Sequence, residues 1–571
     1  MPEKPDNPTN FWRELKRRKV IGVIIAYAAV GYAIVELTDI ITEPLNLPEW
    51  TLTLVIVLVA IGFPIAVIFA WIFDITAKGI KKTEPVEIIN DKEEVKESST
   101  KSDIPDKSII VLPFENMSSD PDQGYFSDGL TEEIITDLSY IDDLLVISRS
   151  SAMTFKNTTK TIPEIARAVN VRYVLEGSVR KEGNNIRMTA QLIDSVTDAH
   201  IWAQKFDGTL DNVFNIQEKV SRSIVSYLKV KLKPDEDHEI SKHIVDNIEV
   251  YECFLKAKQE LWEYTEESLI KAQKILKDGL SKYGENEVFY TGLGQVYFQF
   301  YDSGIRYEPE YLNKIEEYAI KIFRLNPDSA HGYRLLGLYK MKKENALSAF
   351  KSLYRSYELD PANTDTLFWL SYIYSFHLGR PDSASPIVRK LLETDPLNSM
   401  SFSQIAGYYW FKGEGDLALK EFHKIDQRTP NNTMIIWYIS ILKAWNNDYQ
   451  CAIEFIDSYH EKLSENFFFT FILLFKYYLQ RNKAKVAELI TDEVRAIAWN
   501  DFHLPWFFAE CFSLMGETEK ALNWLDRAVD QGVINYPLLS RYDPFLENIR
   551  GERRYEELMK RVKQEWESFE Y

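Results

Sequence analysis

The chain has 571 residues, with 67 Lys and Arg against 86 Asp and Glu, which gives a formal net charge of −19. This length exceeds what one hydrophobic core supports, so several domains are expected. The acidic balance disfavours general nucleic-acid binding, which needs a positive surface. The three cysteines, Cys253, Cys451 and Cys511, lie far apart without a CxxC pair, which excludes a disulfide framework and fits a reducing compartment.

Two apolar segments near the N-terminus predict a membrane hairpin. The predicted spans are 20–41 and 50–74, each long enough to cross about 30 Å of hydrocarbon at about 1.5 Å per residue. Residues 1–19 end in a basic stretch and lysines follow the second span, whereas the connector 42–49 carries only acidic charge. The positive-inside rule then predicts an integral inner-membrane protein with its N-terminus and C-terminal domains in the cytoplasm. The alternative, a cleaved signal peptide, is disfavoured because a second span follows at once.

After the hairpin, a polar linker over 75–106 leads into an α/β segment over 107–232. The linker is rich in Glu, Lys, Ser and Asp and is expected to be solvated. Within the α/β segment, short apolar runs and amphipathic stretches alternate, and Glu182-Gly183-Asn184-Asn185 supplies hairpin turn chemistry. The expected strands are 109–114, 144–147, 173–179, 186–192 and 201–206, and the expected helices are 128–140, 162–169 and 213–228.

This α/β segment resembles the TolB amino-terminal-like (FlgO-like) domain. The resemblance spans about 120 residues and is carried by the segments 111–114, 125–134, 173–179 and 200–203. In that family the domain commonly precedes tetratricopeptide repeats, often behind a transmembrane segment. An adenylate cyclase or winged-helix DNA-binding domain is often fused in the same chain. The resemblance supplies no catalytic residues, and we expect no such effector domain in this chain.

The rest of the chain is organised around four prolines, Pro327, Pro361, Pro396 and Pro430, at steps of 34, 35 and 34 residues. Large apolar residues recur at i, i+3 and i+7 between them, and small residues such as Gly337 recur where paired helices approach. A period of this length resembles the tetratricopeptide repeat family. Four prolines that each end an unrelated helix are a poorer explanation, because the residues between them also keep register.

We therefore predict a tetratricopeptide array over 251–543, with about eight units of which four are clear. A linker over 233–250 precedes the array, and a capping helix over 544–571 covers its last apolar face. The repeat count between 464 and 500 stays open. The predicted fold class is mainly α: a two-helix transmembrane hairpin, a small α/β domain, then an α-solenoid of helix pairs.

The candidate binding surface is the concave face of the array, which first helices line. Exposed aromatic side chains there are good anchors for a partner, since each can bury a large area. The residues expected to point outward on this face are Arg334, Phe368, Tyr372, Trp410 and Trp437. The alternative is that packing between neighbouring repeats consumes them. A carboxylate clamp needs repeated Lys and Asn on this face, and of the five only Arg334 is of that type.

No motif for catalysis, cofactor binding or metal binding emerges. The Gly-x-Gly pairs at 292–294 and 413–415 fall at repeat positions and lack a GxxxxGK[ST] context. The acidic cluster at 128–133 suits a helix N-terminus, and the eight histidines show no HExxH spacing. The sequence therefore predicts a non-enzymatic, membrane-anchored scaffold that binds a protein partner in signalling or regulation. The alternative is a ligand sensor whose α/β domain binds a small molecule or nucleotide.

Overall fold

The computed structural model describes residues 104–241, 247–263, 265–303, 305–306, 308–463 and 468–569, with Thr38, Val55, Val59, Phe73–Thr76 and Gly79–Lys82. The chain divides into two units, Met1–Thr100 and Lys101–Tyr571, which are treated separately. In the first unit, β1 (Phe73–Thr76) pairs antiparallel with β2 (Gly79–Lys82).

The predicted membrane spans, 20–41 and 50–74, lie almost wholly outside the described residues. The last two positions of the second span, Phe73 and Asp74, belong to strand β1 and not to a helix. Phe, Ile and Thr in this short segment favour a strand. Within the described ranges, no helix is long and apolar enough to cross a membrane. On this finding the predicted localisation, an integral membrane protein with both ends cytoplasmic, is wrong and is corrected.

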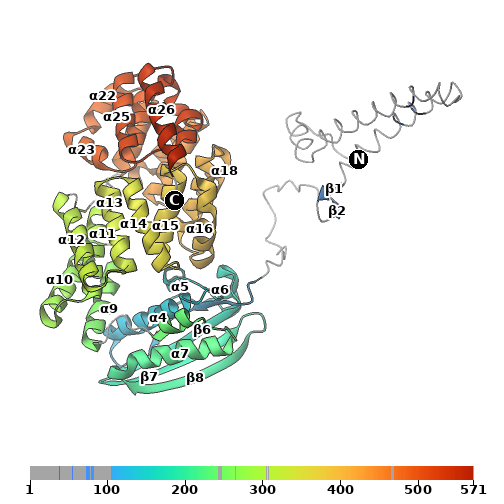
Figure 1. Ribbon diagram of the computed structural model, residues 1–571, viewed down its shortest axis with the longest axis vertical. Helices are drawn as coiled ribbons and strands as arrows, with labels where there is room; N and C mark the ends of the chain where they lie inside the picture. The colour runs from blue at the N-terminus through green and yellow to red at the C-terminus, as the bar shows by residue number, and fades with distance from the viewer. Residues whose placement is uncertain are drawn as a thin grey trace. The chain divides into compact units, whose positions relative to one another are not determined.

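The second unit begins with a sheet domain whose strands run in the order β5-β3-β6-β7-β8, with β4 paired to β6. Strand β3 pairs parallel with β5 and β6, whereas β6, β7 and β8 form an antiparallel meander. Helices α4 and α7 pack against each other beside this sheet (Figure 1). The elements are β3 (Ser108–Val111), β4 (Glu115–Asn116), α4 (Gly124–Ser139), β5 (Leu145–Val146), α5 (Arg149–Met153), α6 (Ile162–Val169), β6 (Tyr173–Glu182), β7 (Asn185–Asp194), β8 (Ala199–Thr209), α7 (Val213–Tyr227) and α8 (Pro234–Ser241).

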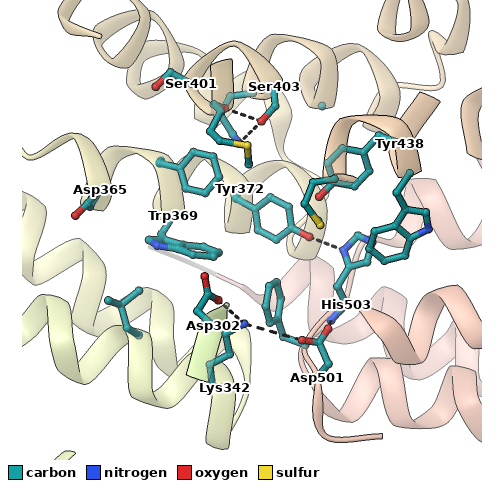
Figure 2. A pocket seen from close by; sticks show the side chains of 18 of the residues that line it. Asp302, Lys342, Asp365, Trp369, Tyr372, Ser401, Ser403, Tyr438, Asp501 and His503 are labelled. Atoms are coloured by element: carbon teal, nitrogen blue, oxygen red, sulfur yellow. Dashed lines mark hydrogen bonds and ion pairs between the residues drawn. The ribbon is translucent and has the colours of Figure 1, made fainter. Parts of the chain in front are cut away.

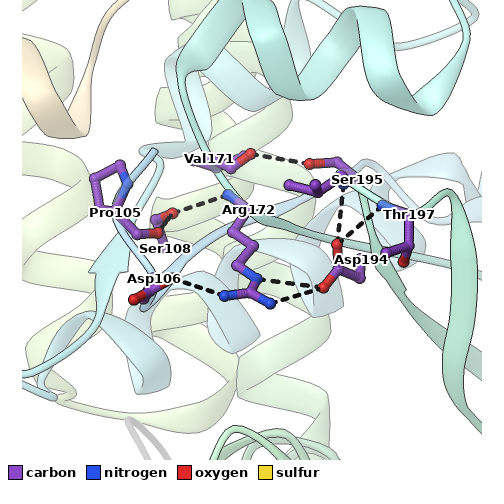
Figure 3. Close-up of polar contacts among 9 residues, drawn as sticks. Pro105, Asp106, Ser108, Val171, Arg172, Asp194, Ser195 and Thr197 are labelled. Carbon is purple, nitrogen blue, oxygen red and sulfur yellow. Dashed lines mark hydrogen bonds and ion pairs between the residues drawn. The ribbon is translucent and has the colours of Figure 1, made fainter. Parts of the chain in front are cut away.

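A polar clasp joins the start of β3, the start of β6 and the end of β7 (Figure 3). Arg172 donates from Nη1 to Asp106 at 2.7 Å, and from Nε and Nη2 to the Asp194 carboxylate, both at 3.2 Å. The backbone N–H of Arg172 also donates to Ser108 Oγ at 2.9 Å. Asp194 is buried, so its charge needs these donors. These hydrogen bonds therefore hold the start of β3 against the start of β6 and the end of β7.

Among the residues that the structure describes, eight helix pairs follow the sheet domain. The pairs are α9 (Ile248–Trp262) with α10 (Glu266–Tyr283), α11 (Glu287–Asp302) with α12 (Pro309–Leu325), α13 (Ala330–Lys343) with α14 (Ala346–Leu359), α15 (Thr364–Tyr372) with α16 (Pro381–Thr394), α17 (Ser399–Phe411) with α18 (Gly415–Arg428), α19 (Thr433–Trp445) with α20 (Tyr449–Leu463), α21 (Phe469–Leu479) with α22 (Lys483–Leu489), and α24 (Leu504–Leu514) with α25 (Thr518–Asp530). Helix α23 (Asp492–Asn500) lies between the last two pairs, and α26 (Arg553–Ser568) closes the array. Part of the predicted linker over 233–250 is helical, because it contains α8.

The four regularly spaced prolines, here called the proline ladder, lie in the turns between one helix pair and the next. Each proline follows the C-cap of a second helix and stands two residues before the N-cap of the next first helix. That N-cap is Ser329, Asn363, Asn398 or Asn432, and its side-chain oxygen accepts a backbone N–H of the first turn. Proline cannot continue a helix, and Asn and Ser satisfy the free donors at a helix start. This turn sets the spacing of 34 to 35 residues and makes the array a solenoid of tetratricopeptide type. The solenoid and the small sheet domain of the predicted fold class are thus confirmed.

The C-terminal end of the array returns to its middle. Asn535 donates from its side-chain amide to the carbonyls of Ser375 and Phe376 at 3.2 and 3.0 Å. These carbonyls belong to the π-helical turn η3 (Ile373–His377) after α15. Ile534 N donates to the His377 carbonyl at 2.9 Å, and Trp566 Nε1 donates to the Leu378 carbonyl at 2.8 Å. The last pair and α26 are therefore tied to the fourth pair.

The sheet domain docks on the array through the turn between α16 and α17. Asp395 is 1% exposed, and its Oδ1 accepts from the hydroxyls of Ser148, Ser150 and Ser151 at 2.5, 2.5 and 2.7 Å. Ser151 Oγ in turn accepts the backbone N–H of Leu397 at 3.0 Å. A second contact joins α4 to α9, where Glu132 ion-pairs with Lys258 at 2.5 Å.

Candidate functional site

The first helices of five consecutive pairs surround a cavity of about 530 Å³. Helices α11, α13, α15, α17 and α19 supply most of the wall, and residues 500–504, which lead into α24, supply the opposite side. Figure 2 shows Trp369 and Tyr372 of α15 in the middle of this space, with Ser401 and Ser403 of α17 on one side and Asp302 and Lys342 on the other.

All five residues predicted on the concave face line this one cavity: Arg334, Phe368, Tyr372, Trp410 and Trp437. Phe368 and Tyr372 are partly exposed. Trp410 and Trp437 are buried, at 1% and 4% exposure, and Arg334 is 7% exposed. Neighbouring residues therefore cover these three side chains, which are not exposed on the concave face. Whether the five residues bind a partner stays a prediction.

The two tryptophans are buried because the C-terminal helices cover that end of the groove. The Trp437 ring lies 5.3 Å from the ring of His503 and 5.1 Å from that of Phe507, measured between centroids. The Trp410 ring lies 6.1 Å from that of Trp506. All three contacts cross from the fifth and sixth pairs to α24 and the residue before it. Helix α24 and the residue before it therefore cover the part of the cavity lined by α17 and α19.

Polar side chains connect the first helices along the wall. Arg334 Nη1 on α13 donates to Gln295 on α11 at 2.9 Å and to the Asp365 carboxylate on α15 at 3.1 Å. Ser371 Oγ on α15 donates to Gln404 on α17 at 3.1 Å. These bonds hold neighbouring first helices in register, and they give the cavity a polar strip beside its aromatic surface.

Lys342, whose side chain is buried, lines the cavity between two aspartates. Lys342 Nζ lies 2.9 Å from Asp302 and 4.0 Å from Asp501, and 4.4 Å from the ring centroid of Phe502. Burial lowers the pKa of Lys342, but the two carboxylates more than offset this and raise it above its ordinary value. The ammonium group is therefore charged and shared between Asp302 and Asp501.

A histidine with a lowered pKa lies at the covered end. His503 is 5% exposed, and its Nδ1 lies 2.5 Å from the hydroxyl of Tyr372. Burial lowers the pKa of His503 to about 4, with a smaller opposing effect from Asp501. The imidazole is therefore neutral at pH 7, and this end of the cavity is lined by uncharged rings.

Sequence reasoning missed part of this site. Trp369 lies three residues before Tyr372 and Lys342 lies eight residues after Arg334, which are helical spacings that the pattern contained. Asp501 and His503 lie far along the chain. They line the cavity because the C-terminal part of the array packs against its middle. No spacing signal within a single repeat could have placed them there.

The described residues contain no group of three or more His, Cys, Asp or Glu that could hold a metal ion. Two carboxylates of the acidic cluster at the start of α4 are engaged in ion pairs. Asp128 pairs with Lys156 at 2.6 Å, and Glu132 pairs with Lys258 and with Arg149. What the cavity offers is a shaped aromatic surface with fixed charges, which suits binding.

Comparison with known proteins finds a family model that is similar to the sheet domain. A family model described as "HilA/YgeH-like transcriptional regulator, second domain" matches residues 105–225. This is the segment in which the sequence resembled a TolB amino-terminal-like domain, and that more specific resemblance stays a prediction. The match covers the strands β3 to β8 and most of α7.

Two curated relatives match parts of the chain. The protein named "Putative adenylate cyclase 3" of Rhizobium meliloti is 44% identical over 169 residues, which cover 30% of this chain and 29% of that protein. The transcriptional regulator HilA of Salmonella typhimurium is 22% identical over 244 residues, which cover 42% of each chain. The chain thus spans less than half the length of either relative.

Among solved structures, a tetratricopeptide repeat protein from Parabacteroides merdae is 14% identical and covers 49% of this chain and 99% of its own, with a TM-score of 0.29. The class of protein follows from the helix pairs described above and not from this likeness. The chain is a tetratricopeptide-type repeat protein that carries a small sheet domain in front of the repeats.

Proposed function

We propose that this chain is a non-enzymatic scaffold whose concave cavity binds a segment of a protein partner in a signalling or regulatory process. The observation that carries the proposal is the convergence of five first helices on one cavity with partly exposed aromatic rings. Partly exposed Trp and Tyr side chains in a pocket are the usual anchors of protein recognition. The match of residues 105–225 to a domain of transcriptional regulators supports a regulatory role.

The relative named as an adenylate cyclase does not argue for catalysis in this chain. The similarity spans 29% of that protein, so its activity does not carry over to this chain. A cavity walled by rings, a shared lysine and a neutral histidine offers shape and charge to a ligand. We therefore assign partner binding to the array and a regulatory role to the sheet domain that docks on it.

The proposal is tested by selecting peptides from a random display library on the full-length protein. The affinity of synthetic versions is then measured by fluorescence anisotropy with the wild-type protein and with Trp369→Ala. Trp369 lines the cavity and is only partly buried, so its removal leaves the deeper packing in place. We expect binding to weaken about tenfold or more, as for an aromatic hot spot.

The matched control is Trp499→Ala, which removes a tryptophan that is 41% exposed and does not line the cavity. Its peptide affinity should equal that of the wild-type protein, and circular dichroism should be unchanged in both variants. Peptides whose affinity is the same for Trp369→Ala and for the wild-type protein would show that the cavity is not the binding site.

A further inference from the structure

More acidic than basic side chains line the cavity. Its lining includes four aspartates, Asp302, Asp365, Asp395 and Asp501, and two cations, Arg334 and Lys342. The side chains of both cations are 8% exposed, whereas those of Asp302, Asp365 and Asp501 are 34%, 63% and 23% exposed. Asp395 is engaged by the serines of the sheet domain. Three carboxylates therefore face two cations, and the carboxylates are the more accessible groups.

Next to these carboxylates, four aromatic rings contact one another nearly at right angles. They belong to Phe298, Trp369, Tyr372 and Phe502, and are called the box below. Trp369 meets Phe298 at 87°, Tyr372 at 86° and Phe502 at 79°, with ring centroids 6.1 to 6.5 Å apart. Tyr372 meets Phe502 at 86° and 5.9 Å. The faces of aromatic rings carry partial negative charge, and they attract an ammonium or guanidinium group within about 6 Å.

One cation of the chain already uses this chemistry. Lys342 lies over the face of Phe502 while Asp302 and Asp501 hold its ammonium group. Figure 2 shows Lys342 and Asp302 below Trp369 and Tyr372, whose rings Lys342 leaves for a ligand. Since Lys342 neutralises only one of its two carboxylates, one negative charge remains beside the rings.

We propose, on the basis of the proposed function, that the partner's segment enters this cavity with a cationic side chain, an arginine or a lysine. Its charged group lies against the partly exposed rings of Trp369 and Tyr372 and pairs with Asp302, the more exposed of the two carboxylates that share Lys342. An acidic side chain would meet the surplus charge. An apolar one would remove water from a carboxylate without offering it a partner, which is costly. The net charge of −19 also steers a basic segment toward this chain.

The test uses the peptides selected on the full-length protein and the affinity assay described above. In each cavity-dependent peptide, every arginine is replaced in turn by citrulline, which keeps the shape and removes the charge, and every lysine by acetyl-lysine. We expect one position at which the replacement weakens binding about tenfold to thirtyfold, as for a desolvated cation on aromatic rings.

The protein variant is Asp302→Asn, which leaves Lys342 paired with Asp501. It should weaken binding of the cationic peptide and not of the peptide already neutralised at the anchor position. The matched control is Asp328→Asn, which removes a carboxylate that pairs with Arg355 at 3.3 Å and does not line the cavity. This control should bind both peptides as the wild-type protein does.

The outcomes separate this inference from the proposed function. Peptides that need Trp369 and also need one cationic residue and Asp302 support both. Peptides that need Trp369 but tolerate every neutral replacement, or bind Asp302→Asn unchanged, overturn the cationic anchor and leave the proposed function in place. A selection that yields no peptide dependent on Trp369 overturns both.

Discussion

One of the contacts that dock the sheet domain on the array is made by a buried carboxylate, Asp395. Its Oδ1 accepts from Ser148, Ser150 and Ser151 at 2.5, 2.5 and 2.7 Å. A hydrogen bond to a charged group contributes about 1.5–3 kcal/mol. Three donors share one oxygen and an amide retains part of its acceptor strength, so the contributions do not add. We expect Asp395→Asn to lower the free energy of unfolding by about 3 kcal/mol.

A double-mutant cycle with Ser151→Ala isolates the contact itself. Ser151 is buried and bonds both Asp395 and the backbone of Leu397. We expect a coupling energy of about 1–2 kcal/mol, from urea unfolding followed by circular dichroism at a constant m-value. Ser139→Ala is the control, because its hydroxyl donates to the Ile135 carbonyl within its own helix. A coupling energy below about 0.3 kcal/mol would refute the reasoning, since independent sites give values of that size.

Two further predictions concern packing and pH. At Gly337, a Cβ atom would lie 2.6 Å from Leu353 Cγ, so Gly337→Ala should cost about 1–3 kcal/mol of unfolding free energy. Gly551→Ala, where a Cβ meets no atom within 4 Å, should cost far less, and equal losses in urea unfolding would contradict the close approach. Burial lowers the pKa of His503 from 6.5 to about 4, so the unfolded chain takes up a proton that the folded chain excludes between these pH values. Between pH 6.5 and 4, the unfolding free energy of His503→Phe should therefore fall by about 3 kcal/mol less than that of the wild-type protein, and the loss that remains includes that from His377, whose pKa burial lowers to about 3. A pH dependence that is the same in the variant would count against the burial of a neutral imidazole.

The repeat array was predictable because its signals are local. The proline ladder and the small residue at Gly337 report contacts between helices that are adjacent in the chain. The sheet domain was predictable for the same reason, since its hairpin from β6 to β7 is set by a short turn. Helix α5, which carries Ser151, was not predicted, because it is five residues long and its contacts lie in the distant turn at Asp395.

The site was predictable only in part. First-helix periodicity placed Phe368, Tyr372 and their neighbours on the concave side, and they do line the cavity. The burial of Trp410 and Trp437 depends on α24, which lies more than sixty residues further along the chain. Which repeats meet across a superhelix depends on its pitch, a sum of small rotations that no single repeat encodes. The predicted localisation was wrong on a separate ground, since within the described part of the chain no helix is long and apolar enough to cross a membrane.

The return of the C-terminal helices to the middle of the array alters how the solenoid comes apart. An open repeat array frays from its ends, since each unit contacts only its neighbours. Here Asn535 and Trp566 bond the carbonyls of Ser375, Phe376 and Leu378 in the fourth pair. Losing the last pair therefore strips partners from backbone groups in the middle of the chain and removes one wall of the cavity. Backbone amides in the fourth and eighth pairs should exchange with solvent together, as parts of one cooperative opening unit.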